Sequence, residues 1–367
     1  MNQQAAPQFG LAKSVLYSLI LIALVLGTAE LGVRTWAHYL RGEVERFDPE
    51  TGTFVLVPGR HRTRFGTVVV NSDGFVGVEL EPDGPDLWRI VAVGDSCTFG
   101  GGNGRDTYPA LLDRRLGRRE RPGLRYEVVN AGISGLSSEL ALKRLLSVVP
   151  PLHPDVVTIY IGWNDLMKFD PVAQGREARF SAVARVLDQL WLARGLRKLL
   201  FFHVRPALLK PRTGPESRTG RFQGFRPTYF EENLESMVGE ARAMGARVLL
   251  ATLPTVVRPW MTLEDLATAR VVFPYFPSAY GVGDLLDLVA SYNRAIARVG
   301  MKTGTPVIDL AARFAEIEDP RPYFHDTMHT NLKGMEVIAE AFEEALDVHG
   351  LLAPAAPIAA GRAERSR

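Results

Sequence analysis

Five short segments of the chain are almost continuously apolar, and they alternate with longer stretches that carry apolar residues at helical spacing. Strands that are buried on both faces, as in a parallel sheet covered by helices, show this pattern. The intervening helical stretches supply the crossovers that parallel strands require. The pattern predicts a three-layer α/β/α domain with a doubly wound parallel sheet. The expected strands are residues 89–94, 126–132, 155–162, 246–254 and 305–310.

Composition excludes several other classes of protein. Of the 367 residues, 46% are hydrophobic and 23% are charged, which is ordinary for a globular chain. The formal net charge of +2 gives no electrostatic reason to expect nucleic acid as a partner. Because Cys97 is the only cysteine, the chain forms no intramolecular disulfide and no metal site built from several cysteines.

The N-terminal segment departs from this average. No residue from Ser14 to Ala29 is charged, Lys13 precedes the run and Glu30 follows it. The run is slightly short for a bilayer core, which takes about 20 residues. A retained single-pass membrane anchor is the favoured interpretation. The alternatives are a cleaved signal peptide, since Gly27 and Ala29 suit a small-residue cleavage site, and a buried helix of a soluble protein. The basic residues on the two sides do not define the orientation.

The chain divides by pattern into four parts. The run "TVVVNSDGF" is β-branched and ends in turn residues, which predicts a small β extension between the anchor and the main domain. The end of the chain is rich in Ala, Pro and Arg and is expected to be disordered. The expected parts are an anchor at 1–40, the β extension at 41–88, the α/β domain at 89–350 with an insertion at 166–228, and a tail at 351–367.

Chemically useful side chains follow several of the expected strands, where the sites of doubly wound sheets lie. Ser96 follows the first strand, Gly132 the second and Asn164 the third, while Asp326 and His329 lie beyond the fifth. Acyl transfer needs a nucleophile, a base and a group that orients the base, which Ser96, His329 and Asp326 can supply. The backbone N–H groups of Ser96 and Gly132 and the side-chain amide of Asn164 are the expected oxyanion donors.

Four motifs together resemble the blocks of a known family. "GDSCTFG", "VVNAGISG", "GWND" and "DTMH" are similar, in order and spacing, to those of SGNH or GDSL hydrolases, over about residues 91–345. The resemblance implies a flavodoxin-like sheet and a serine esterase or acyl hydrolase that needs no cofactor and no metal. Carried over by position, it implies a catalytic triad of Ser96, Asp326 and His329 and an oxyanion hole of Ser96, Gly132 and Asn164.

Each motif also has a plainer interpretation when taken alone. Ser96 could be a helix N-cap, and Asn164 could close a turn after its strand. His325 and His329 could lie four apart on a helix as metal ligands, although no third ligand is evident. Cys97 departs from the apolar residue often found there in bacterial members of the family. It is expected to be a small buried hydrophobe, with a nucleophilic role as the alternative.

Two further segments bear on the substrate. The stretch 191–212 mixes leucines and aromatic residues with Arg and Lys. It fits a helix on the membrane surface, a lid over an acyl pocket, or a helix that packs on the core with a solvated basic face. The loop 271–281, "VVFPYFPSAYG", could line the substrate cleft or be a rigid surface loop.

The resulting expectation is a membrane-anchored serine hydrolase that cleaves an ester through an acyl-enzyme, with its catalytic domain outside the cytoplasm. Its expected partners are an ester substrate, which could be a small molecule, a lipid or an acylated glycan, and the membrane, through the N-terminal helix. One alternative is acyl transfer, typically of acetyl groups, to or from a cell-envelope polysaccharide. Another is a carbohydrate- or lipid-binding module that keeps the fold without catalysis.

Overall fold

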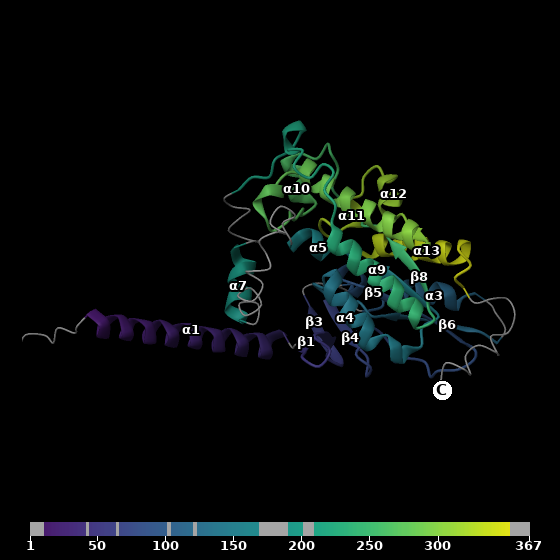
Figure 1. The fold of residues 1–367 in the computed structure, drawn as a ribbon, viewed down its shortest axis with the longest axis horizontal. Helices are drawn as coiled ribbons and strands as arrows, with labels where there is room; N and C mark the ends of the chain where they lie inside the picture. Colours follow the sequence, from purple (N-terminus) through teal and green to yellow (C-terminus); the bar gives the residue numbers. More distant parts are fainter. Residues whose placement is uncertain are drawn as a thin grey trace, which may run out of the picture. The chain divides into compact units, whose positions relative to one another are not determined.

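The central sheet of the protein has five parallel strands in the order β6-β5-β7-β8-β9 (Figure 1). The structure, a computed structural model, describes residues 11–41, 44–63, 66–100, 104–119, 123–168, 190–200 and 209–352. This strand order is that of flavodoxin-like sheets, so the predicted doubly wound α/β fold is confirmed. The strands are β5 (Leu87–Gly94), β6 (Arg125–Asn130), β7 (Val156–Tyr160), β8 (Arg247–Ala251) and β9 (Val307–Ile308).

The apolar runs form these strands because both faces of the sheet are covered. All residues of β5 and of β7 are buried. On one side α4 packs against α9 and α9 against α11, while on the other α3 packs against α13. The helices of this region are α2 (Ser96–Phe99), α3 (Tyr108–Gly117), α4 (Ser138–Val148), α5 (Trp163–Lys168), α9 (Thr228–Ala243), α10 (Leu263–Thr268), α11 (Val282–Thr303), α12 (Leu310–Ala315) and α13 (Leu332–Val348).

The predicted small β extension consists of two antiparallel hairpins. They pair β1 (Glu45–Asp48) with β2 (Thr53–Leu56), and β3 (Gly59–Thr63) with β4 (Gly66–Val70). The extension is bonded to the sheet and to its helices. The Val76 N–H donates to the carbonyl of Asn130 at the end of β6 (3.2 Å), and the Thr53 hydroxyl donates to the Leu140 carbonyl on α4 (3.1 Å).

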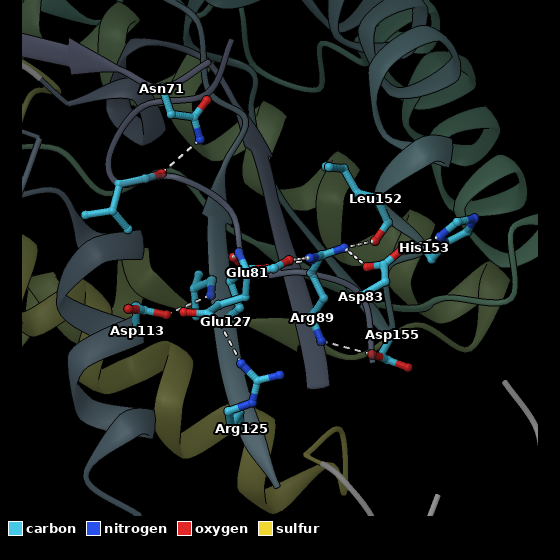
Figure 2. A network of polar contacts seen from close by, with 12 residues as sticks. Asn71, Glu81, Asp83, Arg89, Asp113, Arg125, Glu127, Leu152, His153 and Asp155 are labelled. Atoms are coloured by element: carbon cyan, nitrogen blue, oxygen red, sulfur yellow. Dashed lines mark hydrogen bonds and ion pairs between the residues drawn. The ribbon is translucent and has the colours of Figure 1, made fainter. Parts of the chain in front are cut away.

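A buried arginine ties the segment before β5 to the start of that strand (Figure 2). Arg89 is 3% exposed, and its Nε donates to Glu127 Oε2 on β6 (2.5 Å). The same guanidinium donates to the carboxylate of Asp83 and to the carbonyls of Glu81 (2.6 Å) and Leu152 (2.8 Å). A buried guanidinium needs such complete pairing. This network lies at the amino end of β5, whereas Ser96 follows its carboxyl end.

The chain forms two compact units, one of residues Met1–Glu43 with Gly175–Lys210 and one of Val44–Gln174 with Pro211–Arg367. The first contains α1 (Leu11–Arg41) and α7 (Trp191–Leu199). Within α1, the 23 residues Lys13–Thr35 are long and apolar enough to cross a membrane, with a mean hydropathy of 2.0 over their most apolar 18-residue window. A signal sequence can have the same properties. Residues 169–189 and 201–208 of the predicted insertion, and 353–367 of the predicted tail, lie outside the described residues.

Candidate active site

Ser96 is the first residue of α2, directly after β5. The N-cap of this helix is Asp95, whose carboxylate accepts the Cys97 N–H (2.9 Å). The interpretation of Ser96 as the cap is therefore wrong, and its hydroxyl has another partner. Ser96 Oγ lies 2.8 Å from His329 Nε2.

His329 and Asp326 extend this contact into a chain of three side chains. His329 Nδ1 lies 2.8 Å from each carboxylate oxygen of Asp326. A carboxylate accepts only, so Nδ1 carries a proton in this contact. In the neutral imidazole Nε2 is then unprotonated and can accept the Ser96 proton. This is the arrangement that general-base activation of a serine requires.

The Asp326 carboxylate is held in its charged form. Burial alone would raise the pKa of Asp326. The pKa is nevertheless lowered below its ordinary value by the hydrogen bond from the His329 ring and by the positive charge of that ring when it is protonated. The backbone N–H groups of Met328 (3.2 Å) and His329 (3.0 Å) lower it further. A charged acceptor at Nδ1 would favour an imidazolium form of His329.

The segment that carries these two residues is a loop, not a helix. An antiparallel bridge joins Phe324 to Thr330, and the His325 N–H donates to the His329 carbonyl (2.7 Å). The interpretation of the two histidines as metal ligands on one helical face is therefore wrong.

Thr327 fixes the tip of this loop to two neighbouring loops. Its hydroxyl accepts the Val272 N–H (2.6 Å) and donates to the Val272 carbonyl (2.8 Å). Its own carbonyl accepts the Thr255 hydroxyl (2.8 Å). Thr327 is completely buried, so these bonds hold the backbone between Asp326 and His329 in one position.

Gly132 lies against the backbone of α2. A Cβ at this position would come within 2.4 Å of the Phe99 nitrogen, so only glycine fits so close to the helix that begins at Ser96. The Gly132 N–H donates to Asn130 Oδ1 (3.0 Å), so a developing oxyanion would share or displace this bond. The Asn130 amide in turn donates to the Thr98 carbonyl (3.0 Å), which ties the loop after β6 to α2.

Arg144 supports the same loop from α4. It is 1% exposed, and its Nε donates to the carbonyl of Ala131, next to Gly132 (2.8 Å). Another guanidinium nitrogen donates to the Phe54 carbonyl of the β extension (3.2 Å). Burial lowers the pKa of Arg144 to about 10. The β extension is thus bonded, through one buried side chain, to the loop that holds a predicted oxyanion donor.

Asn164 lies in the first turn of α5, directly after β7. Its amide lies near the carboxyl of Asp95, the residue before Ser96. Burial raises the pKa of Asp95, while the Cys97 N–H, the His329 charge and the Asn164 amide favour the charged form. The structure therefore brings the predicted amide donor close to the turn that carries Ser96.

Asp165, beside Asn164, is bonded to the start of α4. Its two carboxylate oxygens accept the N–H (2.8 Å) and the hydroxyl (2.6 Å) of Ser138. The Ser138 hydroxyl also accepts the Asn233 amide from α9 (3.0 Å). These bonds join three helices and fix the turn of α5 that carries Asn164.

We expect Asp165→Asn to change how stability depends on pH. Burial raises the pKa of Asp165 to about 6, so its contribution to stability is full below its unfolded pKa of 3.8 and is lost as pH rises through 6. The variant does not titrate at this position. Its free energy of unfolding should therefore rise, relative to that of the wild type, by up to about 3 kcal/mol between pH 4 and pH 7. Chemical denaturation across this range measures the gain, with the exposed Asp73→Asn as control. A pH-independent difference between wild type and Asp165→Asn would contradict it.

Cys97 is 2% exposed, and its Sγ lies 3.6 Å from the Met328 carbonyl. Burial, together with the charges of Asp95 and Asp326, raises the pKa of this thiol well above its ordinary value. A thiol must ionise to act as a nucleophile, so the geometry favours the buried small hydrophobe over a reactive cysteine.

The aromatic loop 271–281 packs inward rather than lying on the surface. Phe273 and Phe276 are buried, and the Tyr275 N–H donates to the Met167 carbonyl at α5 (2.8 Å). The Val272 contacts with Thr327 join this loop to the loop of Asp326 and His329 as well. It therefore supports both that loop and the helix that carries Asn164.

The sequence predicted that Ser96, Asp326 and His329 would lie together, and the structure brings them into contact, but the residues that support them were not predicted. Asp95 had a local signal, because an aspartate before a helix start is a common N-cap. Arg144 had none, since its carbonyl partners lie 13 and 90 residues away in the sequence.

Solved structures similar to this chain include "Crystal Structure of TesA", at 21% identity, covering 72% of this chain and 99% of that one, with a TM-score of 0.42. A lipase/acylhydrolase from Enterococcus faecalis is 20% identical over 71% of this chain and 96% of its own, with a TM-score of 0.43. The acetyl xylan esterase AlAXEase is 18% identical over 70% of this chain and 99% of its own, with a TM-score of 0.42. A search of curated proteins gave no match.

The family comparison covers most of the α/β domain and contains every residue of the site. The match extends over residues 92–337, about two thirds of the chain. Ser96, Gly132, Asn164, Asp326 and His329 all lie within it. This chain belongs to the GDSL-like lipase/acylhydrolase family.

Proposed function

We propose that the protein is a serine hydrolase that cleaves an ester through an acyl-enzyme intermediate. The observation that carries the proposal is the hydrogen-bonded chain from Ser96 through His329 to Asp326, with each contact at 2.8 Å. His329 takes the Ser96 proton as Oγ attacks the ester carbonyl, and then gives it to the departing alcohol. Water repeats the sequence to release the acid.

The oxyanion formed at each attack needs donors on the side of Ser96 away from the base. The Ser96 N–H, the Gly132 N–H and the Asn164 amide come from three strand ends and supply donors without charge. The Gly132 N–H would turn from Asn130 Oδ1 to the oxyanion or be shared between the two. Donors that are already in place when the charge develops lower the barrier most.

Reaction with a fluorophosphonate probe tests the proposal. A serine activated by His329 should be labelled, and peptide mapping should place the label on Ser96. Wild-type protein that stays unlabelled, or a label that persists in Ser96→Ala, would contradict the proposal and favour the binding-module alternative.

The amide of Asn164 can be tested separately. Asn164→Ala should lower kcat for p-nitrophenyl acetate by roughly 10²–10³ with little change in KM, the loss expected for one missing oxyanion donor. Steady-state kinetics on folded protein measures both constants. An effect confined to KM would instead assign Asn164 to ground-state binding of the substrate.

Acyl transfer to a sugar hydroxyl is the second candidate, because the same triad serves water or an alcohol as the acyl acceptor. Product analysis with an acetylated sugar donor, with and without a sugar acceptor, separates the two. Free acetate under both conditions supports hydrolysis, and acetyl recovered on the acceptor supports transfer.

We also propose that α1 is a retained single-pass anchor with the hydrolase outside the cytoplasm. The support is the uncharged run Ser14–Ala29, whose residues are exposed along the helix as far as Thr28. Alkaline phosphatase fused after Leu352 should then be active in bacteria. An inactive phosphatase together with a fluorescent GFP fusion at the same point would place the domain in the cytoplasm.

A further inference from the structure

α7 lies beside α1 at one particular level of that helix (Figure 1). The Leu192 N–H, in the first turn of α7, donates to Glu30 Oε2 (2.7 Å), and Arg34 Nε donates to the other carboxylate oxygen of Glu30 (2.7 Å). Glu30 is the first charged residue after the uncharged run. The N-terminus of α7 is therefore fixed at the C-terminal end of the membrane-crossing segment.

This level matters because a carboxylate is costly inside a bilayer core. Glu30 here is paired with a cation and accepts a backbone N–H, the state in which a charge is tolerated at the edge of the apolar region. If α1 crosses a membrane, Glu30 marks the headgroup level and α7 begins at that same level.

The sequence of α7 is divided into two faces. At 3.6 residues per turn, Leu192, Leu196 and Leu199 share one side, while the basic positions 194, 197 and 198 fall on the other. Leu192 is half-buried, but Leu196 and Leu199 are 54% and 51% exposed, and Leu200 after them is 47% exposed. Among the described residues, the leucine face is thus covered by protein only near its start.

We propose that α7 is an interfacial helix that lies in the membrane surface entered by α1, with its leucines among the acyl chains and its basic side toward the lipid phosphates. Apolar leucines opposite Arg and Lys are the pattern of helices that embed about 5–10 Å into a bilayer surface. The inference rests on the proposed anchor. Of the three interpretations of the basic stretch after residue 190, it favours the helix on the membrane surface over a lid and over a helix packed on the core.

The test uses the full chain, reconstituted in vesicles of phosphatidylcholine and phosphatidylglycerol. Leu196→Cys and Lys198→Cys are labelled separately with the fluorophore NBD, and the wild type, with its buried Cys97, is the labelling blank. Quenching by lipids with a spin label on the acyl chain or on the headgroup reports depth. Carbonate extraction of the same vesicles reports whether α1 is inserted.

We expect the Leu196 probe to be quenched more strongly by the acyl-chain label, and the Lys198 probe more strongly by the headgroup label. Equal depth at the two positions, or no quenching of the Leu196 probe while the chain resists carbonate, would overturn the interfacial helix and leave the anchor standing. A blue-shifted Leu196 probe that no lipid quenches would indicate packing on protein and also overturn it. Release of the chain by carbonate would overturn the anchor and the helix placement together.

Discussion

Ser96→Ala is expected to lower kcat for p-nitrophenyl acetate by about 10⁵-fold or more, to near the uncatalysed background. The Oγ at 2.8 Å from His329 Nε2 is the only atom of the triad that bonds to the substrate carbon in the proposed mechanism. His329→Ala should cost nearly as much, because a serine without its base stays protonated. Stopped-flow or long-time spectrophotometric assays with circular dichroism as the fold check measure both losses.

Because the two residues act as one unit, their effects should not add. The double variant Ser96→Ala with His329→Ala should be no slower than either single variant. The matched controls lie beside each residue: Cys97→Ala and His325→Ala should keep kcat within about tenfold of the wild type, since neither side chain is part of the triad. Loss of activity in Cys97→Ala, with turnover kept in Ser96→Ala, would transfer the nucleophile to the cysteine.

Asp326→Ala is expected to lower kcat by about 10³–10⁴-fold, a large effect that is still smaller than that of Ser96→Ala. His329 remains able to accept a proton, but its Nδ1 loses the carboxylate that fixes the ring orientation and stabilises the imidazolium. KM should change little, because Asp326 contacts His329 and its own loop and not the substrate.

Two measurements distinguish this role from a purely structural one. Asp326 also accepts two backbone N–H groups, so the variant should lose some thermal stability, which unfolding experiments measure independently of kcat. The control Asp319→Ala removes a carboxylate that pairs with Arg321 before the triad loop. A loss of stability in both variants with kcat unchanged in Asp326→Ala would contradict the triad assignment.

The sheet was predictable because burial on both faces leaves a direct record in the sequence. Each of the five apolar runs overlaps an observed strand, although the last, expected at 305–310, pairs only at Val307–Ile308. β9 lies at the edge of the sheet and makes ladder hydrogen bonds with β8 alone. The apolar run is therefore longer than the part of it that is paired. The order of the residues at the strand ends then predicted which side chains would meet.

The supports of the site were not predictable in the same way. The Ser138 bonds of Asp165 and the Val272 bonds of Thr327 join residues 27 and 55 positions apart, and no local pattern reports such partners. The plainer interpretation of Ser96 as a helix cap failed because its neighbour Asp95 takes that role. When two polar residues follow each other at the start of a helix, the sequence does not tell which of them is the N-cap until the backbone is known.

The edges of the family match cut through secondary structure. Residue 92 is inside β5, so a fragment that begins there would lose Ile90 and Val91 from the middle of that strand, both fully buried. Residue 337 is inside α13, and a fragment ending there would lose Phe342, whose ring stacks on Tyr108 at 4.8 Å. Because Arg144 is also bonded to Phe54 of the first hairpin, that hairpin belongs to the folded unit. The smallest fragment expected to fold by itself therefore starts before this hairpin and continues to Leu352. The segment that matches the family is therefore shorter than the part of the chain that has to be expressed as folded protein.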